Sequence, residues 1–185
     1  SSDLPEGSVT PQHFYHHDWL HNQLLKKGKK ELAQEMHDLS HLVKIATVVQ
    51  NEPLGDGHAI LQAEELVGAE DFFVFFGDEI LDSIISAPQQ LLNARQKGEI
   101  VLGAQCVPPE DVSRFGIVDK GEKRGESSFL VKGFVEKPQP SEAPSDLALL
   151  GKNLCTPDIF SALRQVEQEK KTGEIRLIDA LILLK

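Results

Sequence analysis

An aspartate, Asp78, directly follows a run of apolar residues at positions 72–76, in the segment FFVFFGDEILD. The run has no polar face, which is typical of a strand buried between two layers of an α/β sheet. Open α/β sheets bind ligands at the carboxyl ends of such strands. Asp78 could therefore contact a ligand, or it could cap the following turn, because Asp is a preferred N-cap residue. The segment alone leaves both possibilities open.

A second candidate site contains Gln50 and a turn with two glycines, Gly55 and Gly57. The β-branched residues 42–49 predict a strand before this turn, and the apolar pattern of residues 60–66 predicts a helix after it. A strand, a glycine turn and a helix in this order bring backbone N–H groups close to a ligand. The glycines alone are a weak signal, because many turns contain them.

Four histidines near the start of the chain suggest a metal site, since two of them would share one face of a helix: His13, His16, His17 and His21. No carboxylate or cysteine completes a ligand set there, and this spacing is common in helices. A solvated helix face is the favoured interpretation.

Composition limits the class of protein. The 185 residues suit one domain, expected over residues 1–185, with a flexible tail at residues 1–12. A formal net charge of -10 argues against nucleic acid or an anionic membrane as the partner. Cys106 and Cys155 form no CxxC pattern, so we expect reduced thiols in a cytoplasmic protein. No apolar run approaches the roughly 20 residues that span a bilayer.

Strands and helices alternate in the predicted order, which indicates an α/β fold with a mostly parallel sheet flanked by helices. The segment Thr156-Pro157-Asp158 is a strong helix start. Further strands are expected at residues 100–107, 115–119, 129–137 and 147–154, and further helices at residues 84–96 and after Gly173. The strands between residues 115 and 154 form a small β-rich region.

Seven segments together resemble one family: GDGHA after Gln50, then FFGDEILD, FGIVD, VEKP, APSDLALLGK, TPDIF and GEIRLIDAL. In this order they are similar to the bacterial UTP–glucose-1-phosphate uridylyltransferases (UDP-glucose pyrophosphorylases), part of the sugar-1-phosphate nucleotidyltransferase family. The resemblance begins near residue 22 and continues to the last residue. It implies a Rossmann-like nucleotidyltransferase fold in which the β-rich region binds the sugar.

The resemblance implies transfer of a uridylyl group from UTP to glucose 1-phosphate, giving UDP-glucose and pyrophosphate without a covalent intermediate. Such transfers depend on positioning and charge neutralisation. Asp78 corresponds to the aspartate that holds Mg²⁺, and Lys137 to the lysine that contacts the sugar phosphate. Both are the expected catalytic residues, although a lone lysine is by default a solvated surface charge.

The expected binding residues also follow from the resemblance. Gln50 corresponds to the glutamine that contacts uracil, against a wall formed by Gly55 and Gly57. Glu136 corresponds to the acid that accepts hydrogen bonds from glucose hydroxyls, and Gly116 to a glycine that lets the backbone approach the sugar. Glu174 and Asp179 lie in a matched segment too, and we expect them to be structural.

The chain departs from the family pattern in several places. A glycine-rich loop and lysine before Gln50, and a second metal-binding aspartate after the last matched segment, have no counterpart, so we expect a fragment or a truncated product. Smaller departures are Asp146, where the family more often has Asn, and Asn153, where it often has an aromatic residue.

Two alternative functions remain open. One is a related sugar-1-phosphate nucleotidyltransferase such as a thymidylyltransferase, and the other is a non-catalytic remnant that binds sugar nucleotides. Unpaired strand edges lead us to expect self-association into a homo-oligomer.

Overall fold

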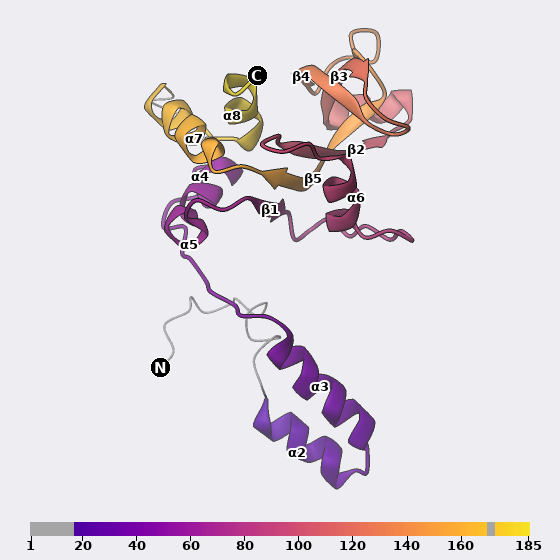
Figure 1. Cartoon of the computed structure of the whole chain (residues 1–185), viewed down its shortest axis with the longest axis vertical. Coiled ribbons are helices and arrows are strands. Elements are labelled where there is room, and N and C mark those ends of the chain that lie inside the picture. Colours follow the sequence, from indigo (N-terminus) through magenta and orange to yellow (C-terminus); the bar gives the residue numbers. More distant parts are fainter. Residues whose placement is uncertain (1–16, 170–172) are drawn as a thin grey trace. The chain divides into compact units, whose positions relative to one another are not determined.

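The structure is a computed structural model that describes residues 17–169 and 173–185 (Figure 1). The tail predicted at residues 1–12 lies outside the described residues. The chain forms two compact units, the first ending at Val49 and the second comprising Gln50–Lys185. Where the sequence predicted one domain over residues 1–185, the two units are described separately below. No helix within the described ranges is long and apolar enough to cross a membrane.

The first unit is a helical hairpin of α2 (Asp18–Lys26) and α3 (Lys30–Leu42). The helices separate at Gly28, which has a φ of 72°. Its N–H donates to Leu25 O at 3.0 Å, and the next N–H, that of Lys29, donates to Leu24 O at 2.9 Å. These two bonds form a Schellman motif, in which the left-handed residue is usually glycine.

The strand predicted at residues 42–49 is wrong. Leu42 ends α3, and no strand pairing is found for the following residues within the described chain. Most of these side chains are exposed. The β-branched composition favours an extended backbone, but a strand also needs a neighbour that accepts and donates its hydrogen bonds.

The second unit contains a five-stranded sheet, whose strands are β1 (Phe72–Phe75), β2 (Val101–Cys106), β3 (Gly116–Lys123), β4 (Phe129–Glu136) and β5 (Leu147–Cys155). Between and around them lie α4 (Asp56–Leu61), α5 (Glu64–Val67), α6 (Ala87–Ala94), the 3₁₀ helix η1 (Pro109–Arg114), α7 (Asp158–Glu169) and α8 (Leu177–Leu183) (Figure 1). Each strand predicted after residue 70 is therefore present, as are helices near the other predicted positions.

The α/β class is confirmed, but the strand directions differ from the mostly parallel sheet that was expected. Every strand pairing within the described residues is antiparallel. The crossover from β1 through α6 to β2 does place these two strands parallel to each other. However, β5 lies between them and runs antiparallel to both. Local alternation of strands and helices could not reveal that a later strand separates β1 from β2.

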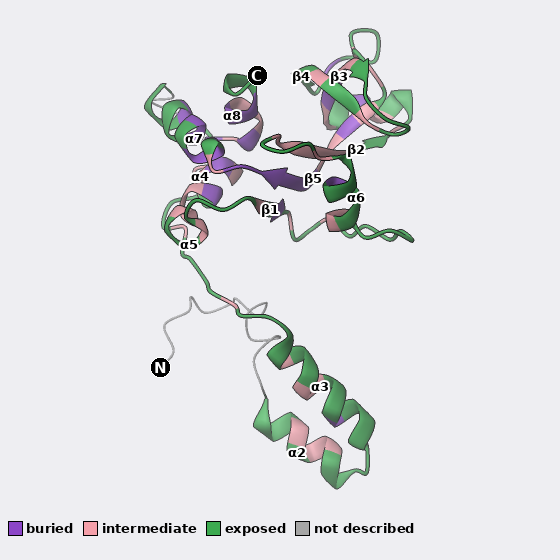
Figure 2. Cartoon of the chain, viewed as in Figure 1, coloured by how far each residue is buried: buried purple, intermediate pink, exposed green. Residues whose placement is uncertain are grey.

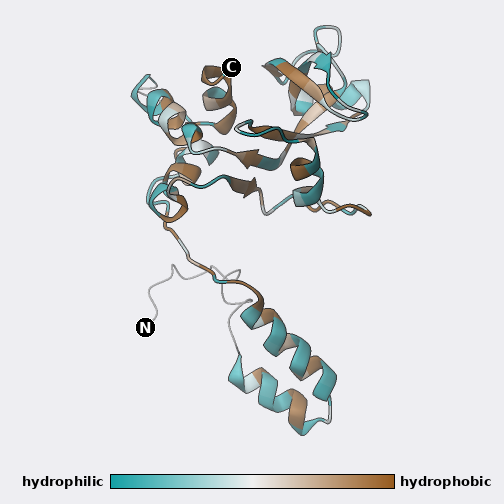
Figure 3. Cartoon of the chain, viewed as in Figure 1, coloured by the Kyte–Doolittle hydropathy of each residue, from teal (hydrophilic) through white to brown (hydrophobic). Residues whose placement is uncertain are grey.

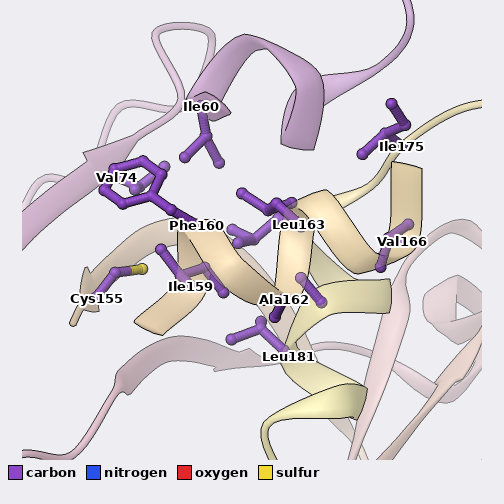
Figure 4. Close-up of a cluster of buried hydrophobic side chains, with 12 residues drawn as sticks. Ile60, Val74, Cys155, Ile159, Phe160, Ala162, Leu163, Val166, Ile175 and Leu181 are labelled. Atoms are coloured by element: carbon purple, nitrogen blue, oxygen red, sulfur yellow. The ribbon is translucent and has the colours of Figure 1, made fainter. Parts of the chain in front are cut away.

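The core of this unit forms where α7 packs on the sheet (Figure 4). Ile159, Phe160 and Leu163 of α7 are almost fully buried. The Phe160 ring stacks on Phe72 of β1 with the ring centroids 5.1 Å apart. As predicted, α7 begins directly after Thr156 and Pro157, whose carbonyls accept the first turn's N–H groups at 3.1 Å.

Only one face of β1 is buried, whereas the sequence predicted burial of both. Phe72 and Val74 pack into the core, but Phe73 and Phe75 are 39% and 42% exposed. Figure 2 shows buried residues concentrated in β5, α7 and α8, while Figure 3 shows that β1 is hydrophobic along its length. Successive side chains of a strand point to opposite faces, so Phe72 and Val74 lie on one face and Phe73 and Phe75 on the other. Within the described residues, no layer covers the face of Phe73 and Phe75.

Candidate active site

A cavity forms where one edge of β5 is not paired with another strand. β1 pairs with β5 from Lys152 to Cys155, β3 pairs with it at Ala148, and β2 occupies the opposite edge. Residues 149–151 therefore face the gap between β1 and β3. The cavity at this gap has a volume of about 160 Å³. It is lined by Asp56, Phe76, Glu79, Gly116, Glu136, Leu149, Leu150, Gly151, Asn153, Arg176, Leu177 and Ile178.

The chain after β1 enters this gap and is held there by β5. Phe76 N–H donates to Gly151 O, and Gly151 N–H donates to Glu79 Oε2, both at 2.8 Å. The buried Lys152 ammonium donates to Phe76 O at 2.9 Å and lies 3.9 Å from Glu79 Oε2. A Cβ at Gly151 would lie 2.5 Å from the Phe76 ring, so only glycine allows this approach. The strand therefore fixes the loop that carries Asp78.

Asp78 itself is exposed and lies beside, rather than in, the cavity. Its carboxylate makes no hydrogen bond or ion pair to any residue that the structure describes. Phe76 and Glu79 on either side of Asp78 are anchored to β5, whereas the Asp78 side chain is available to a ligand. Its neighbour Glu79 lines the cavity, a role that no sequence pattern predicted.

Gly116 and Glu136 are brought together by the pairing of β3 with β4. A Cβ at Gly116 would lie 3.0 Å from Glu136 Oε2 and 3.3 Å from Ile178 Cδ1. The absence of a side chain at Gly116 therefore leaves room for the Glu136 carboxylate at the cavity wall. These are two of the predicted sugar-binding residues, and both line the cavity.

Lys137 ends β4 in an unusual conformation. Its φ is 48°, the one positive value at a non-glycine position within the described chain, and Pro138 follows it. The Lys137 N–H donates to Phe115 O at 3.0 Å, which holds this conformation. The side chain is exposed, makes no hydrogen bond or ion pair to a described residue, and is not part of the cavity lining.

The start of α8 contributes Arg176 to the cavity. Its guanidinium donates two hydrogen bonds to Asp179, each 3.1 Å long, and lies 3.7 Å from Glu136 Oε1. The hydrogen bonds to Asp179 raise the pKa of Arg176, and the nearby charges of Asp179, Glu136 and Asp56 act in the same direction. Arg176 thereby links β4 to α8, and its charge is offset by its neighbours.

The glycine turn packs against the same helix start. Asp56 Oδ1 accepts hydrogen bonds from Gly57 N–H at 2.7 Å and from Leu177 N–H at 3.0 Å. A Cβ at Gly55 would lie 2.5 Å from Ile175 O, and one at Gly57 would lie 2.9 Å from the same atom. The close approach of the turn to residues 175–177 therefore explains why glycine occupies both positions. Their role in nucleotide binding stays a prediction.

Gln50 is tied to this turn through its side chain. The Gln50 amide donates to Gly55 O at 2.9 Å and lies 3.1 Å from His58 Nδ1. The structure thus brings Gln50 to Gly55, while their shared role in binding uracil stays a prediction. Neither residue lines the cavity, whereas Asp56 between the two glycines does.

Comparison with known proteins identifies the family. Residues 15–183 match the model of a family described as nucleotidyl transferase. The chain belongs to the nucleotidyl transferase family. Six of the seven segments that suggested this family contribute to the cavity wall or form the loop after β1, whereas TPDIF lies at the start of α7.

The chain has relatives that are named UTP–glucose-1-phosphate uridylyltransferase. It is 41% identical over 170 residues to the UTP–glucose-1-phosphate uridylyltransferase YngB of Bacillus subtilis, and 39% identical to a UTP–glucose-1-phosphate uridylyltransferase of Staphylococcus epidermidis. These matches cover 91% of the chain but only 57% and 58% of the relatives.

Solved structures agree with the fold. The chain is similar to a UTP-bound UGPase from Acinetobacter baumannii with a TM-score of 0.82 and 28% identity, covering 96% of this chain and 62% of that one. A UDP-glucose pyrophosphorylase complexed with UDP-glucose gives a TM-score of 0.76 and 30% identity, with 94% and 63% covered. The nucleotidyltransferase fold expected from the sequence is confirmed.

Several cavity residues were not predicted: Asp56, Glu79, Asn153 and Arg176. The last two carried a signal, because each is a polar residue inside a segment of apolar residues. Of the departures noted in the sequence, Asn153 lies in the cavity. Asp146 lies elsewhere, 3.2 Å from Lys120, and that hydrogen bond lowers the pKa of Asp146.

The donor set at Asp78 fits Mg²⁺. Mg²⁺ is usually bound by one or two carboxylates together with substrate phosphates and water, rather than by a cage of protein ligands. Asp78 offers one free, exposed carboxylate next to the cavity.

Within the described ranges, no group of three or more His, Cys, Asp or Glu could hold a metal ion. For the histidine hypothesis, His13 and His16 lie outside the described residues, and His21 Nδ1 lies 3.2 Å from Ala33 O.

Proposed function

We propose that the protein transfers a uridylyl group from UTP to glucose 1-phosphate, giving UDP-glucose and pyrophosphate. The observation that carries this proposal is the cavity itself, in which Gly116 and Glu136 of the matched segments converge beside the loop of Asp78. Its support is the common name of the relatives. The chain spans less than two thirds of their length, so the proposal concerns the reaction to which these residues contribute.

The charges of the cavity favour the sugar over the phosphates. Asp56, Glu79 and Glu136 supply three carboxylates, against the single guanidinium of Arg176. An anionic group would be repelled here, whereas hydroxyl groups can donate to the carboxylate oxygens. A volume of about 160 Å³ is below the roughly 300–1,000 Å³ of a typical ligand pocket. The cavity therefore suits the hexose part of a nucleotide sugar.

The phosphates would then lie at the rim of the cavity, near Lys137 and Asp78. The Lys137 ammonium would neutralise the phosphate of glucose 1-phosphate as its oxygen attacks the α-phosphorus of UTP in line. Glu136 would orient the sugar by accepting hydrogen bonds from its hydroxyls. Gln50 would contact uracil. Positioning of this kind supplies most of the rate enhancement over the uncatalysed reaction, and no residue acts as a nucleophile.

Asp78 is the residue that would hold Mg²⁺. When bound, the ion supplies charge neutralisation for the phosphates. The role of the protein is to keep the Asp78 carboxylate exposed and fixed. The hydrogen bonds of Phe76 and Glu79 to β5 do this in the described structure.

The test is to incubate the chain with UTP, glucose 1-phosphate and Mg²⁺ and to measure UDP-glucose by mass spectrometry. We expect product that falls at least tenfold in Asp78→Asn and in Glu136→Gln. The matched control is Asp82→Asn, an exposed acid in the same loop, which should leave the rate unchanged. Product with dTTP in place of UTP would favour the thymidylyltransferase alternative.

A binding measurement distinguishes the proposed catalytic function from the non-catalytic alternative. Calorimetric titration with UDP-glucose should show binding that is weakened by Glu136→Gln but not by Asp82→Asn. Binding without turnover would favour the alternative of a protein that only binds sugar nucleotides. Absence of both binding and turnover would contradict the proposed function.

A further inference from the structure

Asn153 is a buried polar side chain whose hydrogen-bonding capacity is unused. The residue is 1% exposed, and neither its Oδ1 nor its Nδ2 has a hydrogen-bond partner among the described residues. It lines the cavity, and it is the most buried of the polar residues that do so. Leaving a buried polar group unpaired costs about 1–3 kcal/mol. A side chain that carries this cost in the free protein is a candidate for a ligand contact.

The surrounding strands explain why Asn153 finds no partner in the protein. Its backbone is paired on both sides, opposite Val74 of β1 and opposite Leu102 of β2. Both opposite side chains are apolar, so neither can bond to the amide. The nearest residues along β5 do not compensate, because Lys152 donates to the carbonyls of Phe76 and Gly151. An apolar residue would satisfy this position in the fold.

The polar groups that share the cavity are already engaged. Glu79 accepts from Gly151 N–H, Asp56 accepts from two N–H groups, and Glu136 faces the guanidinium of Arg176. An amide both donates and accepts, and so does a hydroxyl group. The excess of carboxylates excludes an anionic partner. A neutral hydroxyl of the ligand therefore matches the amide of Asn153.

We propose that Asn153 is a specificity-determining residue, which hydrogen-bonds one hydroxyl of the hexose bound in the cavity. This inference rests on the proposed function, since it takes the occupant of the cavity to be the sugar of UDP-glucose. Glu136 and Asn153 would contact different parts of the sugar, because they come from β4 and β5. A site that hydrogen-bonds a substrate hydroxyl rejects analogues lacking it, because its buried polar group is then unpaired.

The first test measures the thermal stability of the chain without ligand. Asn153→Leu replaces the amide by an apolar group of similar branching. Because it removes an unpaired buried amide, we expect the melting temperature to rise by about 2–4 °C. If the amide serves the fold instead, the melting temperature falls, and that result overturns the proposal. Thr156→Val is the control, since Thr156 is a buried polar residue beyond β5 that does not line the cavity.

The second test uses UDP-glucose and its analogues deoxygenated singly at sugar positions 2, 3, 4 and 6, titrated by calorimetry. In the wild-type chain, we expect one analogue to bind roughly tenfold more weakly through loss of the Asn153 contact. Asn153→Leu should bind UDP-glucose about tenfold more weakly, with no further loss for that analogue. Thr156→Val should keep the wild-type pattern.

The outcomes separate this inference from the proposed function. If the wild-type chain binds UDP-glucose and Asn153→Leu discriminates among the analogues as the wild type does, the role of Asn153 is wrong and the proposed function stands. If the wild-type chain does not bind UDP-glucose, the proposed function and the assignment of a hexose hydroxyl are both wrong.

Discussion

Lys137 combines a predicted catalytic role with a strained backbone. A positive φ is uncommon outside glycine, and a following proline restricts the backbone further. Strain of this kind is frequent at functional sites. The side chain of Lys137 has no partner among the described residues, so its charge contributes little to the fold. The conformation instead fixes where the side chain leaves the end of β4.

This arrangement predicts that Lys137→Ala loses activity and keeps the fold. Loss of one charge-assisted contact to phosphate corresponds to roughly tenfold to a hundredfold in kcat/KM. Lys137→Gly should lose activity to a similar extent while raising the melting temperature, because glycine adopts a positive φ without strain. Steady-state kinetics and thermal melting measure the two effects. Lys132→Ala, an exposed lysine on the same strand, should change neither, and unchanged turnover in Lys137→Ala would contradict the phosphate role.

Cys155 gives a prediction for the dependence of stability on pH. Burial raises the pKa of its thiol from 9.0 to about 12. Between these two values the unfolded chain loses the thiol proton and the folded chain keeps it. The free energy of unfolding therefore falls as the pH rises through this range, and the contribution is fully present below about pH 9.

The measurement is the melting temperature of wild type and Cys155→Ala from pH 8 to the alkaline limit of stability. The wild type should lose stability more steeply with pH than the variant does. Cys106→Ala should follow the wild-type slope, because Cys106 is exposed. Equal slopes for wild type and Cys155→Ala would show that the thiol ionises as readily in the folded chain as in the unfolded one.

At the scale of elements, β5 positions the loop that carries Asp78. Gly151→Ala places a Cβ where the Phe76 ring lies, and Lys152→Met removes the donor to Phe76 O. Overpacking or loss of a buried hydrogen bond costs about 1–3 kcal/mol, so both variants should melt at a lower temperature. Both should also weaken the Mg²⁺-dependent part of UTP binding, measured by calorimetry with and without the ion. Gly125→Ala, at a turn outside the cavity, is the control. A stability loss without any change in the Mg²⁺ dependence would contradict the positioning role.

The elements also show what the sequence could reveal about the site. Local patterns located the strand ending near Asp78 and the helix start at Thr156, whereas Gly116 and Glu136 were expected from the family resemblance. The contact of Asp56 with Leu177 joins residues 121 positions apart, and no local pattern encodes it. The order of the strands was missed for the same reason, since β5 enters between β1 and β2 from much later in the chain.

Burial was the second property that local patterns misjudged. The run at residues 72–76 predicted a strand with apolar side chains on both faces, and β1 does carry apolar side chains on both faces. Composition does not say what lies over each face. The Phe72 ring stacks on Phe160 of α7. The rings of Phe73 and Phe75 instead contact each other, with their centroids 5.5 Å apart. The strand predicted at residues 42–49 was wrong for a similar reason, because its own residues do not indicate whether another strand lies beside it.

At the scale of the whole molecule, we expect the exposed face and edge of β1 to govern association. Within the described residues β1 pairs with β5 alone, so its other edge has free N–H and C=O groups next to two exposed phenylalanines. An apolar strand at a sheet edge promotes pairing with another chain. The net charge of -10 opposes association, but it is screened at moderate salt. The expected homo-oligomer stays a prediction, and this edge is the surface through which we expect it to form.

Replacing both phenylalanines by lysine, Phe73→Lys with Phe75→Lys, should therefore shift the chain toward monomer. Charged side chains at an edge strand disfavour pairing. Both phenylalanines are exposed, but the Lys152 ammonium lies 5.6 Å from the Phe75 ring centroid, so a thermal melt of the double variant checks that the fold is kept. Sedimentation velocity at low and moderate salt measures the mass distribution, with more association of the wild type at the higher salt. Leu66→Lys, at an equally apolar and 60% exposed position on α5, is the matched control and should associate as the wild type does. A wild-type chain that sediments as a compact monomer at both salt concentrations would contradict the prediction, and equal association of the double variant would place the contact on another surface.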